Sequence, residues 1–184
     1  LEPKIQDLGM DKLLYELELP LCRVLAEMEL AGVYVDRQAL KNFGEMLAKR
    51  IDETQTEIYA LAGGAFNINS TKQLGEVLFE KLNLPALKKT KRGYSTNAEV
   101  LEKLRPYHPI IDLILEYRKY TKLKSTYVDG LEKEIAPDGR IHTVFQNTVT
   151  ATGRLSSTEP NLQNIPVRTP LGAEMRKMFL APEG

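Results

Sequence analysis

The stretch Thr150-Ala-Thr-Gly-Arg-Leu-Ser-Ser-Thr-Glu-Pro-Asn-Leu-Gln-Asn-Ile-Pro-Val-Arg168 decides how this chain is interpreted. Its nineteen residues include two arginines, two asparagines, one glutamine and several hydroxyls. Gly153, Pro160 and Pro166 interrupt any regular backbone, and apolar residues follow neither helical nor strand periodicity. The stretch therefore predicts an irregular, donor-rich surface suited to nucleic acid. Composition alone would favour an ordinary solvated loop.

Composition sets broad limits. The 184 residues suffice for one or two domains with a real core. The single cysteine, Cys22, excludes an internal disulfide framework, and its apolar surroundings predict a small core residue. No apolar segment approaches the roughly 18 residues of a membrane span, and the N-terminus has no targeting pattern, so we expect a cytoplasmic protein with no membrane partner. Because the chain begins with Leu1, we expect a processed product or an excised piece.

A formal net charge of zero conceals a segregation of charge along the chain. Residues 1–87 carry nine Lys/Arg against fourteen Asp/Glu, residues 88–124 carry ten against four, and residues 125–184 carry six against seven. A short basic block is usually a solvated face, but this one is interleaved with hydroxyls and glycine. The middle segment is therefore a second candidate for contact with nucleic acid.

Apolar spacing predicts a mainly helical first part. A helical pattern covers residues 11–31, with Pro20 placed to start a second helix and Gly32 to end it. Asp36 is a credible N-cap for a long helix to about Ala62. The buried stripe of this long helix is expected to comprise Leu40, Phe43, Leu47, Ile51, Ile58 and Leu61.

Shorter helices and a second long helix follow. Asn69-Ser70 should cap one short helix, and Ser95 or Thr96 another, after a flexible basic loop at residues 88–95. A second long helix is predicted from Pro109 to about Glu134, so that two long helices joined by a helical tip form an antiparallel stalk. After a turn at residues 137–139, residues 140–145 alternate as a strand. The predicted fold class is α+β, mainly α.

Several segments of the sequence, taken in order, resemble the polymerase region of the family A DNA polymerases. The matching segments are residues 150–157, 160–168 and 172–179, with further agreement upstream at residues 66–70, 89–96, 117–127 and 139–143. The resemblance covers nearly the whole chain. It implies that residues 1–36 are a palm-proximal helical segment, that residues 37–136 are the helical thumb, and that residues 137–184 begin the antiparallel strands of the palm.

Basic and hydroxyl side chains in the implied thumb are candidate phosphate contacts. Lys88, Lys89, Lys91 and Arg92 lie within five residues, beside hydroxyls and a glycine that admits the backbone. The start of a helix at Ser95 would add free N–H groups. Arg118, Lys122 and Ser125, at spacings of four and three, share one helical face that Tyr127 flanks, with a solvated basic face as the alternative. The resemblance places this helix along the duplex minor groove, and the predicted contacts of the thumb are Lys89, Thr90, Lys91, Ser95, Arg118, Lys122, Ser125 and Tyr127.

Arg154 is the residue to which we assign the most specific role. Both base-pair types present acceptors in the minor groove, so an arginine there can test pairing geometry without demanding a sequence. The resemblance implies that Ser156, Ser157, Asn161, Gln163, Asn164 and Arg168 make neighbouring contacts to bases and backbone. Asn161 and Asn164 have the alternative role of bonding the backbone of a turn. The chain departs from the family pattern at Asn147, where many relatives carry glutamine.

No residue of this span is predicted to be catalytic. Nucleotidyl transfer uses two metal ions held by carboxylates, and the family's metal-binding aspartates match no residue here. His108 and His142 have no ligand partners at suitable spacing, so both are expected to make structural hydrogen bonds, and neither a metal nor another cofactor is expected in this span. Mg²⁺ and deoxynucleoside triphosphates are expected only for the intact polymerase.

The sequence thus predicts a fragment of a template-directed DNA polymerase that binds primer–template DNA. Its parent would be a DNA-directed DNA polymerase, a nucleotidyltransferase of replication and repair, whereas this span alone would be inactive. The alternative is a stand-alone noncatalytic module, derived from a polymerase thumb, that binds DNA or a partner protein. A single-subunit RNA polymerase shares the right-hand plan but is not expected to carry the words between Thr150 and Arg168.

Overall fold

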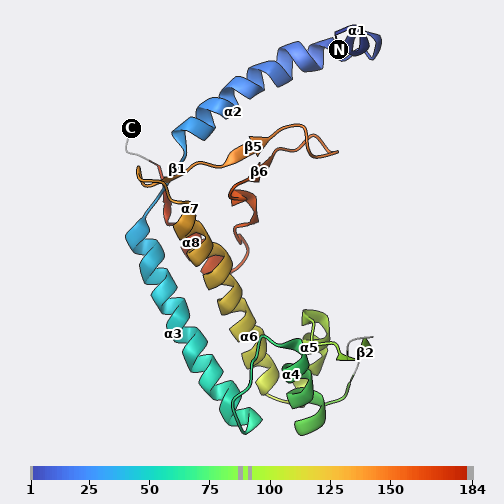
Figure 1. Ribbon diagram of the computed structural model, residues 1–184, viewed down its shortest axis with the longest axis vertical. Coiled ribbons are helices and arrows are strands. Elements are labelled where there is room, and N and C mark those ends of the chain that lie inside the picture. Colours follow the sequence, from blue (N-terminus) through green and yellow to red (C-terminus); the bar gives the residue numbers. More distant parts are fainter. Residues whose placement is uncertain (1, 87–88, 91–92, 182–184) are drawn as a thin grey trace. The chain divides into compact units, whose positions relative to one another are not determined.

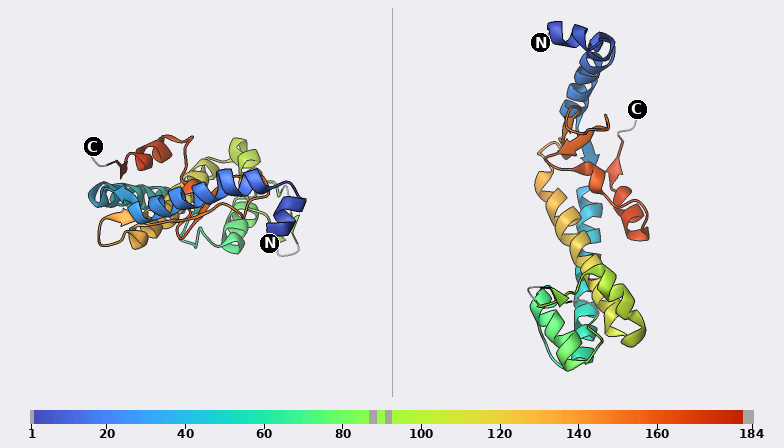
Figure 2. Two further views of the ribbon diagram at one scale, coloured as in Figure 1. Left: turned by 90° about the horizontal axis from the view of Figure 1, so that it is seen from above. Right: turned by 90° about the vertical axis from the view of Figure 1, so that its right-hand side faces the viewer.

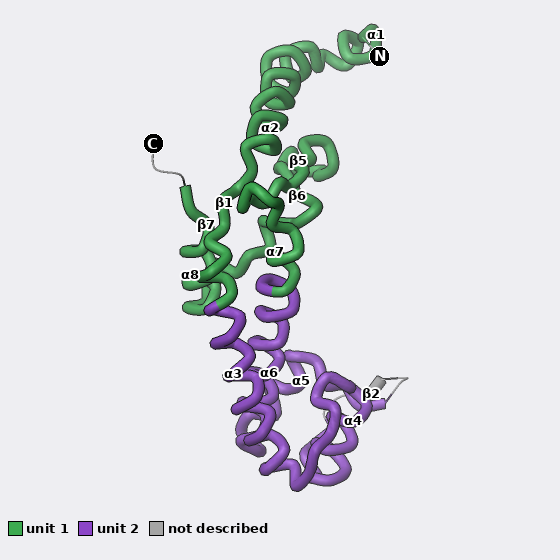
Figure 3. Tube along the Cα trace, turned by 60° about the vertical axis from the view of Figure 1, so that its left-hand side comes forward, with its two compact units in different colours: residues 1–41, 129–184 green, residues 42–128 purple. Residues whose placement is uncertain are grey.

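The computed structural model describes residues 2–86, 89–90 and 93–181 (Figure 1). The chain divides into two compact units, one formed by residues 1–41 and 129–184 and the other by residues 42–128 (Figure 3). In the described ranges, no helix combines the length and the apolar character needed to cross a bilayer.

Unit 2 contains most of the helical core. α3 and α6 run side by side in opposite directions (Figures 1 and 2), as the predicted stalk requires. Ile58 of α3 and Ile114 of α6 belong to one buried cluster, together with Leu78 and Leu101 from the short helices. The elements of this unit are α3 (Arg37–Ala62, which begins in unit 1), α4 (Thr71–Gly75), η2 (Glu76–Lys81), β2 (Lys89–Thr90), β3 (Gly93–Tyr94), α5 (Ala98–Leu104), η3 (Arg105–Tyr107), α6 (Ile110–Lys122) and the π-helical stretch η4 (Leu123–Val128).

Local capping explains where these helices begin. Asp36 Oδ1 accepts from Ala39 N at 2.9 Å, and Ser70 Oγ accepts from Gln73 N at 3.3 Å, so both predicted caps are confirmed. The predicted cap of α5 was wrong. Asn97, not Ser95 or Thr96, accepts from Val100 N, at 2.9 Å.

The predicted stripe of α3 is mostly buried, with one correction. Leu40, Phe43, Leu47 and Ile58 are at most 7% exposed, whereas Leu61 is 38% exposed and Ala62, at 2%, takes its place. Ala62 lies four residues after Ile58 and therefore continues the same helical face. The predicted flexible loop at residues 88–95 was also wrong where it is described, because Lys89 pairs with Tyr94 and Thr90 with Gly93 in a short hairpin.

Unit 1 combines the N-terminal helices with small antiparallel sheets. β1 is central to a three-stranded sheet of order β4-β1-β7, and Tyr34 pairs with both Arg140 and Leu180. A separate pair joins β5 to β6, with Phe145 opposite Ser157. The elements are α1 (Glu2–Asp7), η1 (Leu13–Glu18), α2 (Leu19–Ala31), β1 (Val33–Val35), α7 (Asp129–Glu134), β4 (Arg140–Ile141), β5 (Val144–Gln146), β6 (Ser156–Thr158), the 3-10 turn η5 (Leu162–Asn164), α8 (Pro170–Arg176) and β7 (Phe179–Leu180). Helices and few antiparallel strands confirm the α+β, mainly α prediction.

Three predictions for unit 1 were wrong. Residues 140–145 form two strands in two sheets rather than one, because β4 pairs with β1 whereas β5 pairs with β6; between them, the Thr143 hydroxyl shares its proton between the carbonyl oxygens of Thr158 and Pro160. The stretch from Thr150 to Arg168 is not wholly irregular, since it contains β6 and η5. Cys22 is exposed rather than buried, because Leu25 is the buried residue of α2. The predicted end of α2 at Gly32 is confirmed, with φ of 63°.

Candidate nucleic-acid interface

In unit 2, an open polar pocket of about 560 Å³ lies between the start of α4, the start of α5 and α6. Arg118 of α6 reaches into this region, and its guanidinium donates to the carbonyl oxygen of Thr96 and, at 3.2 Å, to Thr96 Oγ1. Burial lowers the pKa of the Arg118 guanidinium below its ordinary value, although an arginine remains charged at neutral pH. The pocket is lined by Asn69, Thr71, Tyr94, Ser95, Thr96, Asn97 and Arg118.

The structure brings Ser95 and Arg118 together although they lie on different elements. It adds three polar residues that sequence reasoning did not assign to a site, namely Asn69, Thr71 and Asn97. The sequence signal for Asn69 was that of a helix cap, which is a local pattern, and Asn97 was not singled out. Their convergence on Arg118 depends on the packing of α4 and α5 against α6, so no spacing along the chain could have revealed it.

The other candidates of the thumb differ in how they are presented. Lys122 and Ser125 are exposed, whereas Arg118 and Tyr127 are half-buried. Lys122 lies one turn after Arg118 on α6, and Ser125 lies in the π-helical stretch that follows. Lys89 and Thr90 lie in the β2–β3 hairpin, while Lys88, Lys91 and Arg92 lie outside the described residues. The phosphate contacts assigned to these side chains stay predictions.

In unit 1, the β5–β6 hairpin and the turn after it carry the second group of candidates. Arg154 is exposed, and its carbonyl oxygen accepts from Thr150 Oγ1 across the hairpin loop. Ser156 pairs with Gln146 in the ladder and is partly buried. Asn164 and Arg168 are exposed further along the chain.

Three of the predicted contact residues build this turn with their own side chains. Ser157 is 1% exposed, and its hydroxyl accepts from Leu162 N at 3.1 Å and donates to Asn161 Oδ1 at 3.4 Å. Asn161 Oδ1 also accepts from Gln163 N at 2.9 Å, and Gln163 Nε2 donates to Leu155 O at 3.0 Å. The alternative that Asn161 bonds the backbone of a turn therefore describes its geometry in this chain. The DNA contacts assigned to these three residues stay predictions.

Both histidines make structural hydrogen bonds, as predicted. His108 Nδ1 accepts from Ile110 N at 3.1 Å at the start of α6. His142 bonds Glu29 O at 2.8 Å and Asp138 Oδ2 at 3.0 Å. Within residues 2–86, 89–90 and 93–181, no three His, Cys, Asp or Glu side chains converge on a position for a metal ion. Asn147, where the chain departs from the family pattern, donates to Glu18 Oε2 at 2.8 Å.

The described residues combine a mainly helical unit with a unit of small antiparallel sheets, and each unit carries polar candidate residues. Residues 37–184 match the family model of DNA polymerase family A, and the chain belongs to this family. It is 57% identical over 175 residues to DNA polymerase I of Bacillus caldotenax, covering 94% of this chain and 20% of that protein. It is 52% identical over 182 residues to the thermostable DNA polymerase I of Thermus aquaticus, covering 96% of this chain and 22% of that protein.

A solved structure agrees with these relatives. The chain matches the POL domain of Pol1 from M. smegmatis, in complex with DNA primer-template and dNTP, with a TM-score of 0.88 and 45% identity. The match covers 100% of this chain and 32% of that one. The chain therefore spans about a fifth of the length of the curated relatives and a third of the solved polymerase domain.

Proposed function

We propose that this chain is the thumb and the first part of the palm of a DNA polymerase, and that it binds primer–template duplex. The observation that carries the proposal is the polar pocket of unit 2, where Arg118 and Ser95 meet beside the exposed Lys122. The complex of the structurally similar Pol1 domain with primer-template supports the same partner.

The unit 2 surface suits a sequence-independent grip. Arginine, lysine, hydroxyl and amide side chains are the donors that contact phosphate and sugar in protein–DNA interfaces, and such contacts carry no base information directly. A polymerase must hold any sequence that it has made, so this property fits the proposed role. Asn69 and Thr71 join the predicted contacts as further phosphate donors.

The hairpin of unit 1 suits a check on base pairing. Arg154 is exposed in the loop of the β5–β6 hairpin, where its own carbonyl oxygen accepts from Thr150 Oγ1 and the carbonyl oxygen of the next residue, Leu155, accepts from Gln163 Nε2. A cation held in this way can donate to the minor-groove acceptors that every Watson–Crick pair presents. A mispaired terminus would displace those acceptors, so the contact would report on correct pairing.

The intact parent is proposed to catalyse template-directed DNA synthesis in replication and repair. That reaction would use Mg²⁺ ions and deoxynucleoside triphosphates, which the parent and not this span would bind. No residue of this chain matches the metal-binding aspartates of the family. We therefore infer that the 184-residue chain binds a primer terminus without extending it.

Salt-dependent binding tests the proposal. If about five phosphates are neutralised, the logarithm of the association constant for a labelled primer–template hairpin should fall with the logarithm of salt concentration at a slope near −4.5. Lys122→Ala should make the slope shallower by about 0.9, because one phosphate contact is lost. Lys49→Ala, at an exposed cation of α3 that lies 3.9 Å from Glu53 and is not a predicted DNA contact, is the control and should leave the slope unchanged. A flat salt response of the wild-type chain would refute the proposed surface.

Primer extension tests the second half of the proposal. The chain alone, with Mg²⁺ and all four nucleotides, should give no extended product. Robust nucleotide incorporation by the isolated chain would contradict the inference that the chain binds a primer terminus without extending it.

A further inference from the structure

His142 lies between two acceptors that cannot supply a proton. Its Nδ1 is 2.8 Å from the carbonyl oxygen of Glu29, at the C-terminal end of α2, and its Nε2 is 3.0 Å from Asp138 Oδ2, in the turn before β4. A carbonyl and an ionised carboxylate only accept hydrogen bonds, so each ring nitrogen must carry its own proton. Both bonds therefore exist together only when the imidazole is a cation.

Two of the groups around His142 favour its charged state, and one charged neighbour opposes it. The carbonyl oxygen of Glu29 and then the carboxylate of Asp138 raise the pKa of His142 above its ordinary range, while Arg140 opposes them. Arg140 is itself occupied, since its Nη1 donates to Ala31 O at 3.1 Å and to Gly32 O at 3.4 Å. The bond from Arg140 N and then that from His142 lower the pKa of Asp138.

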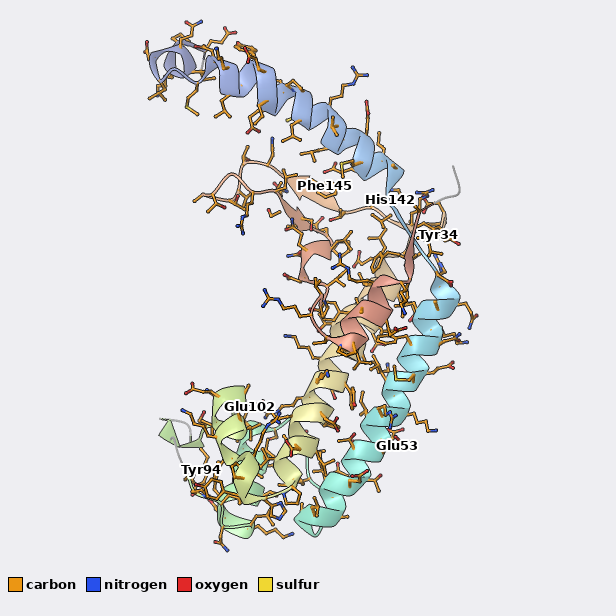
Figure 4. The ribbon with its side chains drawn as sticks, turned by 180° about the vertical axis from the view of Figure 1, so that it is seen from behind. Tyr34, Glu53, Tyr94, Glu102, His142 and Phe145 are labelled. Atoms are coloured by element: carbon orange, nitrogen blue, oxygen red, sulfur yellow. The ribbon has the colours of Figure 1, made fainter. Side chains whose placement is uncertain are left out.

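Contact at Gly32 shows how closely the ring is held. A Cβ added at Gly32 would lie 2.7 Å from Cε1 of His142. The imidazole therefore packs against the backbone where α2 ends, and it connects this end to the turn before β4. Figure 4 shows His142 and Phe145 beside α2.

The same helix also holds the start of the hairpin. Glu29 Oε1 accepts from Phe145 N at 2.7 Å, so Glu29 bonds His142 through its backbone and β5 through its side chain. Further along, Asn147 Nδ2 donates to Glu18 Oε2 at 2.8 Å. Residues 142–147 are thus attached to α2 and η1 at three points before the chain reaches the loop that bears Arg154.

We propose that His142, protonated on both ring nitrogens, is a positioning residue that holds the β5–β6 hairpin on α2 and thereby fixes the loop carrying Arg154. The attachment is a property of the chain itself, and only its consequence for DNA rests on the proposed function. Loss of one imidazole proton breaks one of the two bonds, so the hairpin is held less firmly at high pH.

The direction of the pH effect follows from the two groups. The His142 contribution is complete below the pKa of an unfolded histidine, about 6.5, and it is lost as pH rises through the higher folded value. The Asp138 contribution is present above the unfolded pKa of an aspartate, about 3.9, and it is lost as pH falls through the lower folded value. Attachment should therefore be strongest between these limits, in mildly acidic solution.

NMR of the histidine rings in the 184-residue chain tests the attachment directly. The chain has two histidines, and His108 is the internal reference because its Nδ1 bonds Ile110 N rather than a carboxylate or a carbonyl oxygen. At pH 6.5, both nitrogens of His142 should give protonated ¹⁵N shifts. Exchange of the Phe145 amide, corrected for the intrinsic effect of hydroxide, should accelerate as His142 titrates.

Asp138→Asn is the discriminating variant. The asparagine oxygen can still accept from Arg140 N, which bonds Asp138 Oδ1 at 3.0 Å, so the turn is retained while the charge opposite His142 is removed. The pKa of His142 should fall because the charge of Asp138 no longer favours the imidazolium, and the pH at which Phe145 exchange accelerates should fall with it. The proposal would be overturned if His142 were neutral at pH 6.5 in the wild-type chain. It would also be overturned if the rate of Phe145 amide exchange did not change as His142 titrates.

A DNA arm separates this inference from the proposed function. At a pH between the wild-type and Asp138→Asn midpoints, the variant should bind a primer–template hairpin more weakly than the wild type, and the two should converge at lower pH. Equal affinity at every pH, with the NMR shifts as expected, would overturn the effect on Arg154. Absence of DNA binding by either chain would refute the proposed function, while the NMR result would still decide the role of His142.

Discussion

Arg118→Ala separates two roles that one arginine combines, support of the pocket and contact with phosphate. The guanidinium donates to two oxygens of Thr96, a residue that is 4% exposed, so its removal leaves poorly solvated acceptors without their partner. Hydrogen bonds to a charged group contribute about 1.5–3 kcal/mol. Because the guanidinium is only half-buried, solvent screening reduces this figure, and we expect a loss of about 2 kcal/mol.

Urea unfolding followed by circular dichroism measures this loss. With a typical slope of about 2 kcal/mol per M, the unfolding midpoint should fall by about 1 M. Lys122→Ala, one turn further along α6 and exposed, should stay within about 0.5 kcal/mol of wild type. Both variants should weaken duplex binding and reduce the salt slope by about 0.9.

Arg118→Lys provides the intermediate case. A lysine keeps the charge but cannot present two donors in the fixed fork of a guanidinium, so it should recover DNA affinity better than stability. Equal stability of Arg118→Ala and wild type would refute the supporting role, and an equal loss in Lys122→Ala would show that the effect is not specific to the Thr96 contact.

Three further substitutions test other features of the structure. Asn97→Ala should cost about 1 kcal/mol as the cap of α5, whereas Ser95→Ala should be nearly neutral, and thermal unfolding compares them. Gly172→Ala would place a Cβ 2.5 Å from the carbonyl oxygen of Pro166 and should destabilise unit 1 by about 1–3 kcal/mol, as overpacking does. Arg154→Ala should leave stability within about 0.5 kcal/mol but weaken extension and mismatch discrimination in the intact polymerase; unchanged extension would remove its assigned role.

Helix boundaries were predictable where the deciding contact is local. Asp36 caps α3 through an amide three residues away, and α3 ends at Ala62, before two glycines with positive φ. Information of this kind lies within one turn of chain and can be read from a sequence. The cap of α5 was mispredicted because Thr96, which has a suitable hydroxyl, bonds to Arg118, 22 residues away.

Strand boundaries depended on partners that are distant in sequence. Residues 140–145 alternate as one strand would, yet β4 pairs with β1 and β5 pairs with β6. The sequence pattern determines which residues can be extended. It does not determine which sheet a strand joins, and β1, the partner of β4, lies about one hundred residues away in the chain. The prediction that Cys22 is buried was wrong for a related reason. Apolar neighbours in the sequence do not show whether other segments cover the face of the helix on which Cys22 lies.

In the candidate site, the donor residues could be predicted from the sequence, but their hydrogen-bond partners could not. The sequence motifs identified the donor side chains between Thr150 and Arg168. They could not show which of these side chains form hydrogen bonds within the fold. The side chains of Ser157, Asn161 and Gln163 bond within residues 155–163 and hold the turn that follows β6, whereas Arg154, in the loop before β6, and Arg168, after the turn, are exposed.

In such a cluster, some donors bond within the fold and keep the backbone in place, and only the remaining donors are available to bind a ligand. Each amide or hydroxyl that bonds within the turn removes a donor from the surface, but the bond from Gln163 Nε2 to Leu155 O also holds the backbone next to Arg154. Preorganisation of that kind lowers the entropy cost of binding, since a side chain on a fixed turn has fewer arrangements to lose. The pocket around Arg118 combines the same two uses, because Arg118 bonds Thr96 while Ser95, the residue before Thr96, lines the same pocket.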